Sequence, residues 1–194
     1  MISCDIDGVL ADFYNPYINR FGIPKSSSEI TKNVMRKLSK DKDFWMNLPK
    51  INTLEWVPKR YTTARTISKR WIKEYLDKEG FPKAPVYQVL NYNLSKYKYV
   101  KGCDLHIDDS LSVFFDLNLK GFPCLLYTNN GNLSWGDVGR IHTLNLDEIE
   151  LAYNSILKIN FKELYISFSV LSYLTPKLCI ISFLSFVVNS RKTA

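Results

Sequence analysis

Residues 1–13 read Met1-Ile2-Ser3-Cys4-Asp5-Ile6-Asp7-Gly8-Val9-Leu10-Ala11-Asp12-Phe13. An apolar run leads into two aspartates two positions apart, and a glycine follows at once. In an extended strand, side chains at positions i and i+2 point to the same face, so Asp5 and Asp7 can converge at the strand end. Gly8 then allows a sharp turn. Two such carboxylates repel each other unless a cation or a proton intervenes, which predicts a magnesium site with one carboxylate free for chemistry.

Short apolar stretches alternate with helical patterns along the rest of the chain. Alternation of this kind predicts an α/β fold in which a Rossmann-like parallel sheet has helices on both faces. Ligands of such sheets bind beyond the carboxyl ends of the strands, where the candidate residues fall. We expect strands at residues 1–7, 60–63, 85–90, 104–107, 123–128 and 140–144, and helices at about 13–22, 67–79, 110–119 and 147–158.

The chain divides into a core, an insertion and an extension. Residues 23–56 are polar and rich in lysine, with apolar residues at helical intervals, and we interpret residues 14–56 as a small helical cap inserted after strand 1. The core then comprises residues 1–13 and 57–158. Residues 159–194 form an apolar extension that is consistent with a membrane segment, with additional packed elements or with a tail of no selected function. A membrane span is the weaker interpretation because Pro176 and Lys177 interrupt it.

Charge and cysteine content limit the partners and the compartment. The formal net charge of +7 suits an anionic partner, either a phosphorylated small molecule or a nucleic acid, although the basic residues are scattered. The four cysteines show no Cys-x-x-Cys spacing, so we interpret them as reduced, buried thiols of a cytoplasmic protein. Nothing in the sequence indicates the oligomeric state.

Two further segments place polar side chains at predicted strand ends. Tyr61-Thr62-Thr63-Ala64-Arg65 closes the second strand, and the Thr63 hydroxyl can donate to a phosphate oxygen. Asp104-Leu105-His106-Ile107-Asp108-Asp109-Ser110 closes the fourth strand with two adjacent carboxylates, which are suitable magnesium ligands. His106 and His142 lack the neighbouring ligands that a zinc site needs, and we interpret both as structural.

These segments resemble the motifs of the haloacid-dehalogenase-like (HAD) superfamily. Residues 5–12 match the first motif, D-x-D-G-[VT]-[LI]-x-[DN], without a gap, and residues 104–110 resemble the fourth, D-x-x-[IV]-D-D-[SR]. The resemblance covers roughly residues 1–150. It is closest to the 5′(3′)-deoxyribonucleotidase-like branch, which includes phage-type members. It implies Mg²⁺ as cofactor and hydrolysis of phosphate monoesters through an aspartyl-phosphate.

The resemblance also assigns roles to single residues. Asp5 would attack phosphorus, and Asp7 would protonate the leaving oxygen and then activate water. Thr63 would bind the phosphate, with further contacts from Thr62, Ala64 and Arg65. The metal would be held by Asp5, Asp7 (through its backbone carbonyl), Asp108 and Asp109.

The phosphate clamp should be a lysine, because its charge stabilises the nucleophile and the phosphate oxygens. By its spacing to Asp108 and Asp109, Lys98 fits the nucleotidase branch best. Lys96 is the alternative, and Lys101 is the third lysine of the segment.

Three aromatic residues, two in the predicted cap and one at its boundary with the core, are candidates for contact with the substrate. In the related branch, cap aromatics contact the base, so Phe13, Phe44 and Trp45 are candidates for stacking on a pyrimidine. The alternative is that Phe44 and Trp45 only pack the cap against the core. The sequence thus predicts a phosphatase acting on nucleoside monophosphates. A phosphatase for nucleic-acid 3′ ends and an inactive HAD-like binding module are the alternatives.

Overall fold

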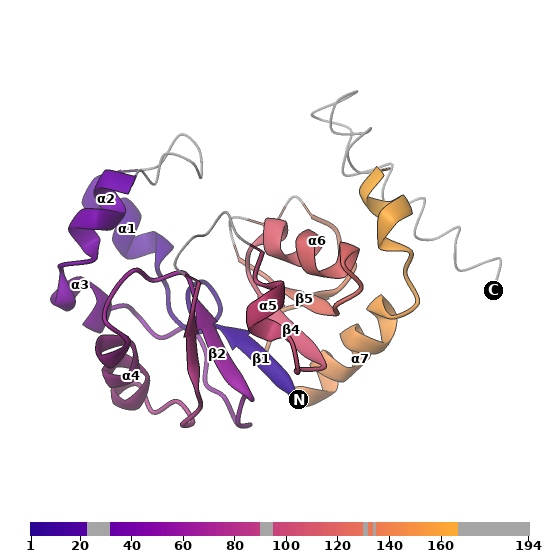
Figure 1. Ribbon diagram of the computed structural model, residues 1–194, viewed down its shortest axis with the longest axis horizontal. Helices are drawn as coiled ribbons and strands as arrows, with labels where there is room; N and C mark the ends of the chain where they lie inside the picture. The colour runs from indigo at the N-terminus through magenta and orange to yellow at the C-terminus, as the bar shows by residue number, and fades with distance from the viewer. Residues whose placement is uncertain (23–31, 90–94, 130–131, 134, 167–194) are drawn as a thin grey trace.

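The computed structural model describes residues 1–22, 32–89, 95–129, 132–133 and 135–166 (Figure 1). Six strands form one sheet in the order β3-β2-β1-β4-β5-β6, and each neighbouring pair is parallel. Helices flank the sheet, so the predicted α/β fold is confirmed. The elements are β1 (Ile2–Asp5), α1 (Tyr14–Phe21), α2 (Lys32–Leu38), α3 (Lys42–Met46), β2 (Arg60–Thr63), α4 (Lys69–Lys78), β3 (Val86–Gln88), α5 (Tyr97–Val100), β4 (Leu105–Asp108), α6 (Leu111–Leu119), β5 (Cys124–Tyr127), β6 (Arg140–Ile141) and α7 (Leu146–Ile156).

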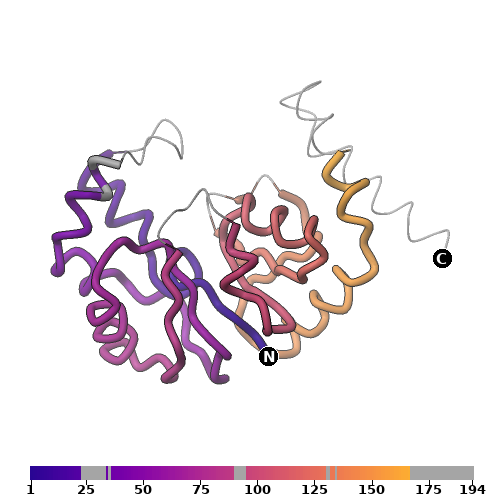
Figure 2. Tube along the Cα trace, viewed as in Figure 1, coloured from indigo at the N-terminus to yellow at the C-terminus, as the bar shows by residue number. Residues whose placement is uncertain are grey.

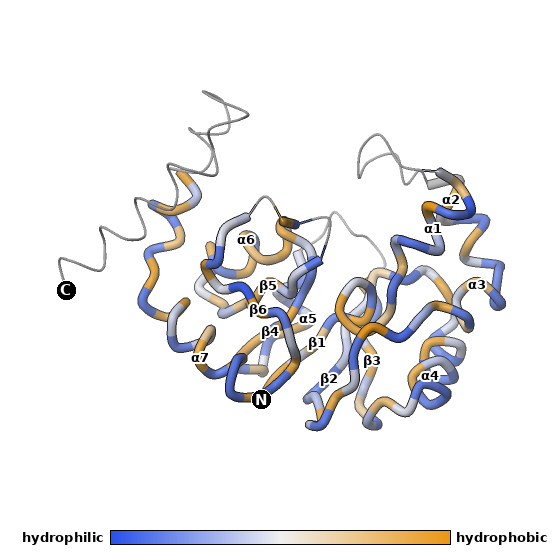
Figure 3. Tube along the Cα trace, turned by 180° about the vertical axis from the view of Figure 1, so that it is seen from behind, coloured by the Kyte–Doolittle hydropathy of each residue, from blue (hydrophilic) through white to orange (hydrophobic). Residues whose placement is uncertain are grey.

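Helix α4 shows how local sequence sets these elements. It begins after Ser68, whose side-chain oxygen accepts a hydrogen bond from the backbone N–H of Arg70 and so caps the helix. Ile72, Tyr75 and Leu76 follow at helical spacing and are buried. Hydrophilic and hydrophobic residues accordingly alternate along α4 in Figure 3. The four-residue helix α5 was not predicted, because one turn is too short to give a periodic pattern.

The insertion after β1 is helical, as predicted, and its described residues form α1, α2 and α3. Figures 1 and 2 show α1, α2 and α3 grouped beside α4, on the opposite side of the molecule from α6 and α7. An ion pair of 2.7 Å between Lys42 and Glu74 joins α3 to α4. The function of this insertion as a cap stays a prediction.

The apolar extension begins as part of the folded core. Residues 161–166 are helical, and the buried ring of Phe161 lies 5.6 Å from the ring of Phe114 in α6. The rest of the extension, residues 167–194, lies outside the described residues, as do the three interpretations of it. Among the residues described, none of the helices has the length and hydrophobicity needed to span a bilayer. Three cysteines, Cys4, Cys103 and Cys124, are buried free thiols as expected, and Cys179 lies outside the described residues.

Candidate active site

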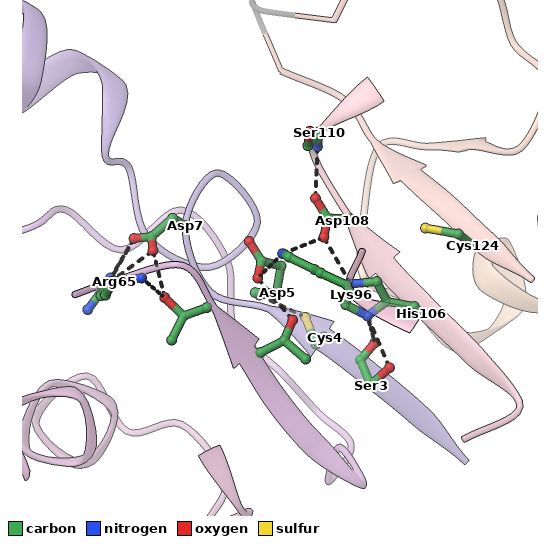
Figure 4. A network of polar contacts seen from close by, with 12 residues as sticks. Ser3, Cys4, Asp5, Asp7, Arg65, Lys96, His106, Asp108, Ser110 and Cys124 are labelled. Atoms are coloured by element: carbon green, nitrogen blue, oxygen red, sulfur yellow. Dashed lines mark hydrogen bonds and ion pairs between the residues drawn. The ribbon is translucent and has the colours of Figure 1, made fainter. Parts of the chain in front are cut away.

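Strand register brings the candidate carboxylates together. In β1, Cys4 pairs with Ile107 of β4, and the next residue, Asp5, pairs with Thr62 of β2 on the other side. Asp5 and Asp108 therefore end neighbouring strands at the same edge of the sheet (Figure 4). Carboxylate oxygens of Asp5, Asp108 and Asp109 lie within 4.8 Å of one another. The predicted meeting of residues about 100 positions apart in the chain is confirmed.

The lysine of this cluster is Lys96. Its Nζ lies 2.6 Å from Asp5 Oδ1 and 2.7 Å from Asp108 Oδ2, and its side chain is almost fully buried. The choice of Lys98 as the clamp was therefore wrong. Lys98 is exposed, and its Nζ lies 4.8 Å from the ring centre of Tyr99. Lys96 immediately precedes α5 and Lys98 lies within it, and residues two apart on a helix point about 200° apart, so only one can face the site.

Hydroxyl groups contact both aspartates of the first motif. Thr62 donates to Asp5 Oδ1 at 3.0 Å, whereas Thr63 donates to Asp7 Oδ2 at 3.0 Å. The prediction placed the phosphate-binding hydroxyl on Thr63, but Thr62 is the one that contacts the predicted nucleophile. Successive side chains of a strand alternate in direction, so neighbouring threonines contact different partners.

Asp7 does not join the other carboxylates. The Arg65 Nε donates to Asp7 Oδ1 at 2.9 Å, and Arg65 Nη2 lies 2.8 Å from the same oxygen. Strand β1 ends at Asp5, so the strand alternation that predicted a meeting of Asp5 and Asp7 does not extend to Asp7, and Gly8 follows with a φ of 79°. The Asp7 carboxylate, paired with Arg65, is therefore held apart from the cluster, as Figure 4 shows. Ala64 is partly exposed between Thr63 and Arg65.

Asp109 is held against the turn at Gly8. Asn129 donates to Asp109 Oδ2 at 2.6 Å, and the buried Asn132 donates to the Asp109 backbone carbonyl at 2.8 Å. A Cβ at Gly8 would lie only 2.0 Å from Asp109 Oδ2. Glycine is thus required here both by its backbone angle and by the approach of this carboxylate. The two asparagines were not predicted, although they follow β5 at the same sheet edge.

We expect the Gly8→Ala variant to lose stability and to displace Asp109. A left-handed backbone costs a non-glycine residue about 1–2 kcal/mol, and the clash with Asp109 adds to this. Gly80→Ala is the matched control, because Gly80 has a φ of 72° with no atom within 4 Å of the added Cβ. Urea unfolding should show a larger loss for Gly8→Ala than for Gly80→Ala. Equal losses would mean that the contact with Asp109 is unimportant.

The aromatic candidates differ in exposure. Trp45 is 1 % exposed, donates its indole N–H to the Leu38 carbonyl at 2.7 Å and stacks on Phe13 at 5.6 Å between ring centres. Its ring also lies 5.1 Å from the Arg65 guanidinium. The prediction that Trp45 and Phe13 stack on a base is thus not supported by their burial, since both pack within the protein. Phe44 is only half-buried and remains the candidate.

Burial and charge set the ionisation of the cluster. Burial raises the pKa of Asp5 to about 7, against the opposing effect of Lys96. Burial, followed by the charge of Asp108, raises the pKa of Asp109 well above its ordinary value. For Asp108, burial is outweighed by Lys96 and by a hydrogen bond from His106, so its pKa is lowered. Burial also opposes the charge on Lys96, yet the two carboxylates raise its pKa above the ordinary value.

These directions indicate a shortage of positive charge. Among the described residues, three carboxylates gather at this edge of the sheet, and one ammonium group, that of Lys96, contacts two of them, Asp5 and Asp108. His106 adds no charge, because burial lowers its pKa. The ionised cluster therefore carries an excess of two negative charges, which a divalent cation with oxygen ligands would neutralise. Comparison of the chain with models of known protein families, and with curated proteins, gave no match.

Proposed function

We propose that this protein is a Mg²⁺-dependent phosphomonoesterase of the HAD type that acts on nucleoside monophosphates. The observation that carries this proposal is the environment of Asp5. Its Oδ1 accepts hydrogen bonds from Lys96 and Thr62, whereas no hydrogen bond to Oδ2 is found among the described residues. One oxygen is thus fixed by a cation and a hydroxyl, and the other is available as a nucleophile.

The residues fit the metal that the resemblance implies. Asp5, Asp108 and Asp109 supply oxygen ligands, the type that Mg²⁺ prefers, and their excess negative charge matches a divalent ion. The Asp7 side chain lies with Arg65, so Asp7 can join this set only through its backbone carbonyl. When bound, Mg²⁺ would neutralise the phosphate oxygens and so favour the approach of an anionic nucleophile.

The chain's own residues then account for two chemical steps. Asp5 attacks phosphorus, and the bond from phosphorus to the ester oxygen breaks while that oxygen takes a proton from Asp7. Asp7 then removes a proton from water, which attacks the Asp5-bound phosphoryl group and releases inorganic phosphate and free Asp5. Lys96, which contacts Asp5 Oδ1, counters the charge on the reacting oxygens throughout.

The proposal is tested by hydrolysis with the purified full chain. We expect p-nitrophenyl phosphate and nucleoside 5′-monophosphates to release phosphate with Mg²⁺ and to be stable in EDTA. The mononucleotides should be hydrolysed with the higher kcat/KM. Absence of turnover on every ester in the panel would contradict the phosphatase and leave an inactive binding module.

A second candidate substrate is a nucleic-acid 3′ end. The chain has a formal net charge of +7. Two segments, residues 32–42 and 69–78, together contain nine basic and three acidic residues. Several of these basic side chains are exposed, including Arg36, Lys40 and Lys73. Electrostatic binding of a polyanion weakens steeply with salt. Faster hydrolysis of a 3′-phosphorylated oligonucleotide than of mononucleotides, lost at high salt, would favour this alternative.

We expect Phe44→Ala to act on the nucleotide and Trp45→Ala to act on folding. Removing the half-buried Phe44 should raise KM for a nucleoside monophosphate more than KM for p-nitrophenyl phosphate, because only the former has a base to stack. Truncating the buried Trp45 should instead cost about 3–5 kcal/mol of stability. Steady-state kinetics and thermal unfolding distinguish the two. Equal losses of both substrates in Phe44→Ala would show that this ring only packs.

A further inference from the structure

His106 belongs to the same polar network as the acids but has no part in the steps above. It is fully buried in β4, two residues before Asp108, so both side chains point to the same face of the strand. Its Nε2 lies 2.9 Å from Asp108 Oδ2, and its Nδ1 lies 3.0 Å from the Ser3 hydroxyl of β1 (Figure 4). From its position in the sequence, this histidine was predicted to be structural.

The partners of the ring fix its orientation. Asp108 is an ionised carboxylate and can only accept, so the proton lies on Nε2, which donates to Asp108. Nδ1, on the other side of the ring, lies 3.0 Å from the Ser3 hydroxyl oxygen, and that hydroxyl donates to the Leu105 carbonyl oxygen at 3.2 Å. The Ser3 backbone carbonyl, 3.3 Å from Nδ1, gives the ring a second contact on β1. The imidazole is thus held in one orientation by two strands.

The two carboxylate oxygens of Asp108 differ in the number of hydrogen bonds that they accept. Oδ2 accepts from both Lys96 and His106, which occupies its two acceptor positions. Oδ1 accepts from the backbone N–H of Ser110 at 2.9 Å, which leaves that oxygen one acceptor position. The carboxylate cannot exchange its two oxygens without breaking all three bonds inside a buried site. A single lone pair on Oδ1 is therefore the one left for a cation.

We propose that His106 is a positioning residue that selects Oδ1 of Asp108 as the oxygen offered to the divalent cation. This inference rests on the proposed function in so far as the cluster binds a cation. Partners behind a metal ligand fix its orientation and tune its affinity, and their removal weakens metal binding or activity by about 10–100-fold. Lys96 alone does not fix the orientation of the Asp108 carboxylate, because its ammonium group is shared between Asp108 and Asp5.

The test compares side chains of similar size that keep or lose the Nε2 donor. In His106→Gln the amide nitrogen can occupy the place of Nε2 and donate to Asp108, whereas His106→Leu has no donor. Binding of Mn²⁺ to the full chain, followed by electron paramagnetic resonance of the free ion, gives a readout independent of turnover. We expect His106→Leu to bind Mn²⁺ about 10–100-fold more weakly than the wild type, and His106→Gln to recover most of that loss.

Two further variants keep the test decisive. Ser3→Ala removes the anchor of Nδ1 while His106 stays, so it should weaken Mn²⁺ binding in the same direction even if the leucine variant does not fold. His142→Leu is the control, because His142 is exposed and its backbone N–H bonds to Glu148. Mn²⁺ affinity unchanged in both folded His106→Leu and Ser3→Ala, with only the melting temperature lowered, would overturn the inference.

The outcome also separates this inference from the proposed function. If the wild type binds Mn²⁺ and His106→Leu does not, but no phosphate ester is hydrolysed, the positioning role stands and the phosphatase fails. If the wild type hydrolyses esters with Mg²⁺ and His106→Leu binds Mn²⁺ equally well, the phosphatase stands and the positioning role fails. A wild type that binds no divalent cation overturns both.

Discussion

Asp5→Asn should abolish phosphate release while the protein stays folded. An amide is not a nucleophile towards phosphorus, so the first step is lost, and removal of a nucleophile lowers kcat by roughly 10³- to 10⁶-fold. Asparagine has nearly the same shape, and its side-chain oxygen can still accept from Thr62 or Lys96. Phosphate release with Mg²⁺, measured at saturating ester, checks the result. A rate equal to that of the wild type would refute the assignment of Asp5.

Although Asp5→Asn should lose activity, we expect its stability to be equal to or higher than that of the wild type. In the metal-free protein, burial raises the pKa of Asp5 to about 7 from its ordinary 3.8. A carboxyl whose folded pKa is raised is destabilising when ionised, so its penalty is absent below pH 4 and complete above pH 7. In EDTA at pH 8, Asp5→Asn should therefore melt at or above the temperature of the wild type, and this advantage should vanish near pH 4. Asp77→Asn, at an exposed position of α4, is the control.

Lys96→Met should be among the most destabilising single substitutions in the chain. Methionine preserves the apolar length of the side chain but leaves Asp5 and Asp108 buried without their shared cation. Breaking a buried ion pair from one side costs about 3–5 kcal/mol. Urea unfolding at pH 7 should show this loss, and it should shrink as the pH falls, because protonated carboxylates no longer require a counter-ion. Hydrolysis should fall as well, since Asp5 loses the charge that stabilises it.

Lys98→Met is the matched control for this substitution. Lys98 lies two residues away, is exposed and contacts only the ring of Tyr99 among the interactions found in the described part of the chain. Surface substitutions of this kind change stability by no more than about 0.5 kcal/mol. If Lys98→Met lost activity and Lys96→Met did not, the lysine assigned by the geometry would be the wrong one.

The fold was largely predictable because its signals are local. Each predicted strand is a short apolar stretch bounded by polar or turn residues, and all six predicted strands occur in the sheet. Their ends differ from the prediction by at most three residues: β2 matches at Arg60–Thr63, whereas β1 was predicted at residues 1–7 and is found at Ile2–Asp5. Helix α4 begins at Lys69 rather than at residue 67, because Ser68 caps it. Such boundaries depend on single hydrogen bonds that a periodic pattern does not contain.

The sequence predicted which acidic residues form the candidate site, but it did not predict which lysine and threonine side chains contact them. Asp5, Asp108 and Asp109 could be identified because parallel strands present their carboxyl ends at one edge of the sheet. The lysine could not, because Lys96 and Lys98 differ only in the direction that a one-turn helix gives them. The partners of Thr62 and Thr63 could not be predicted either. Their side chains alternate in direction along β2, so Thr62 donates to Asp5 and Thr63 donates to Asp7.

The order of residues along the chain was enough to predict the alternation of strands and helices, the edge at which the acids gather and the turn that Gly8 allows after Asp7. The lysine that joins Asp5 to Asp108, the separation of Asp7 by Arg65 and the contact of His106 with Asp108 became visible in the folded chain alone. The position of a strand can be predicted because it depends on the pattern of apolar and polar residues over a few neighbouring positions. The choice of partner depends on the directions of side chains brought together by register, and residues distant in sequence fix that register together.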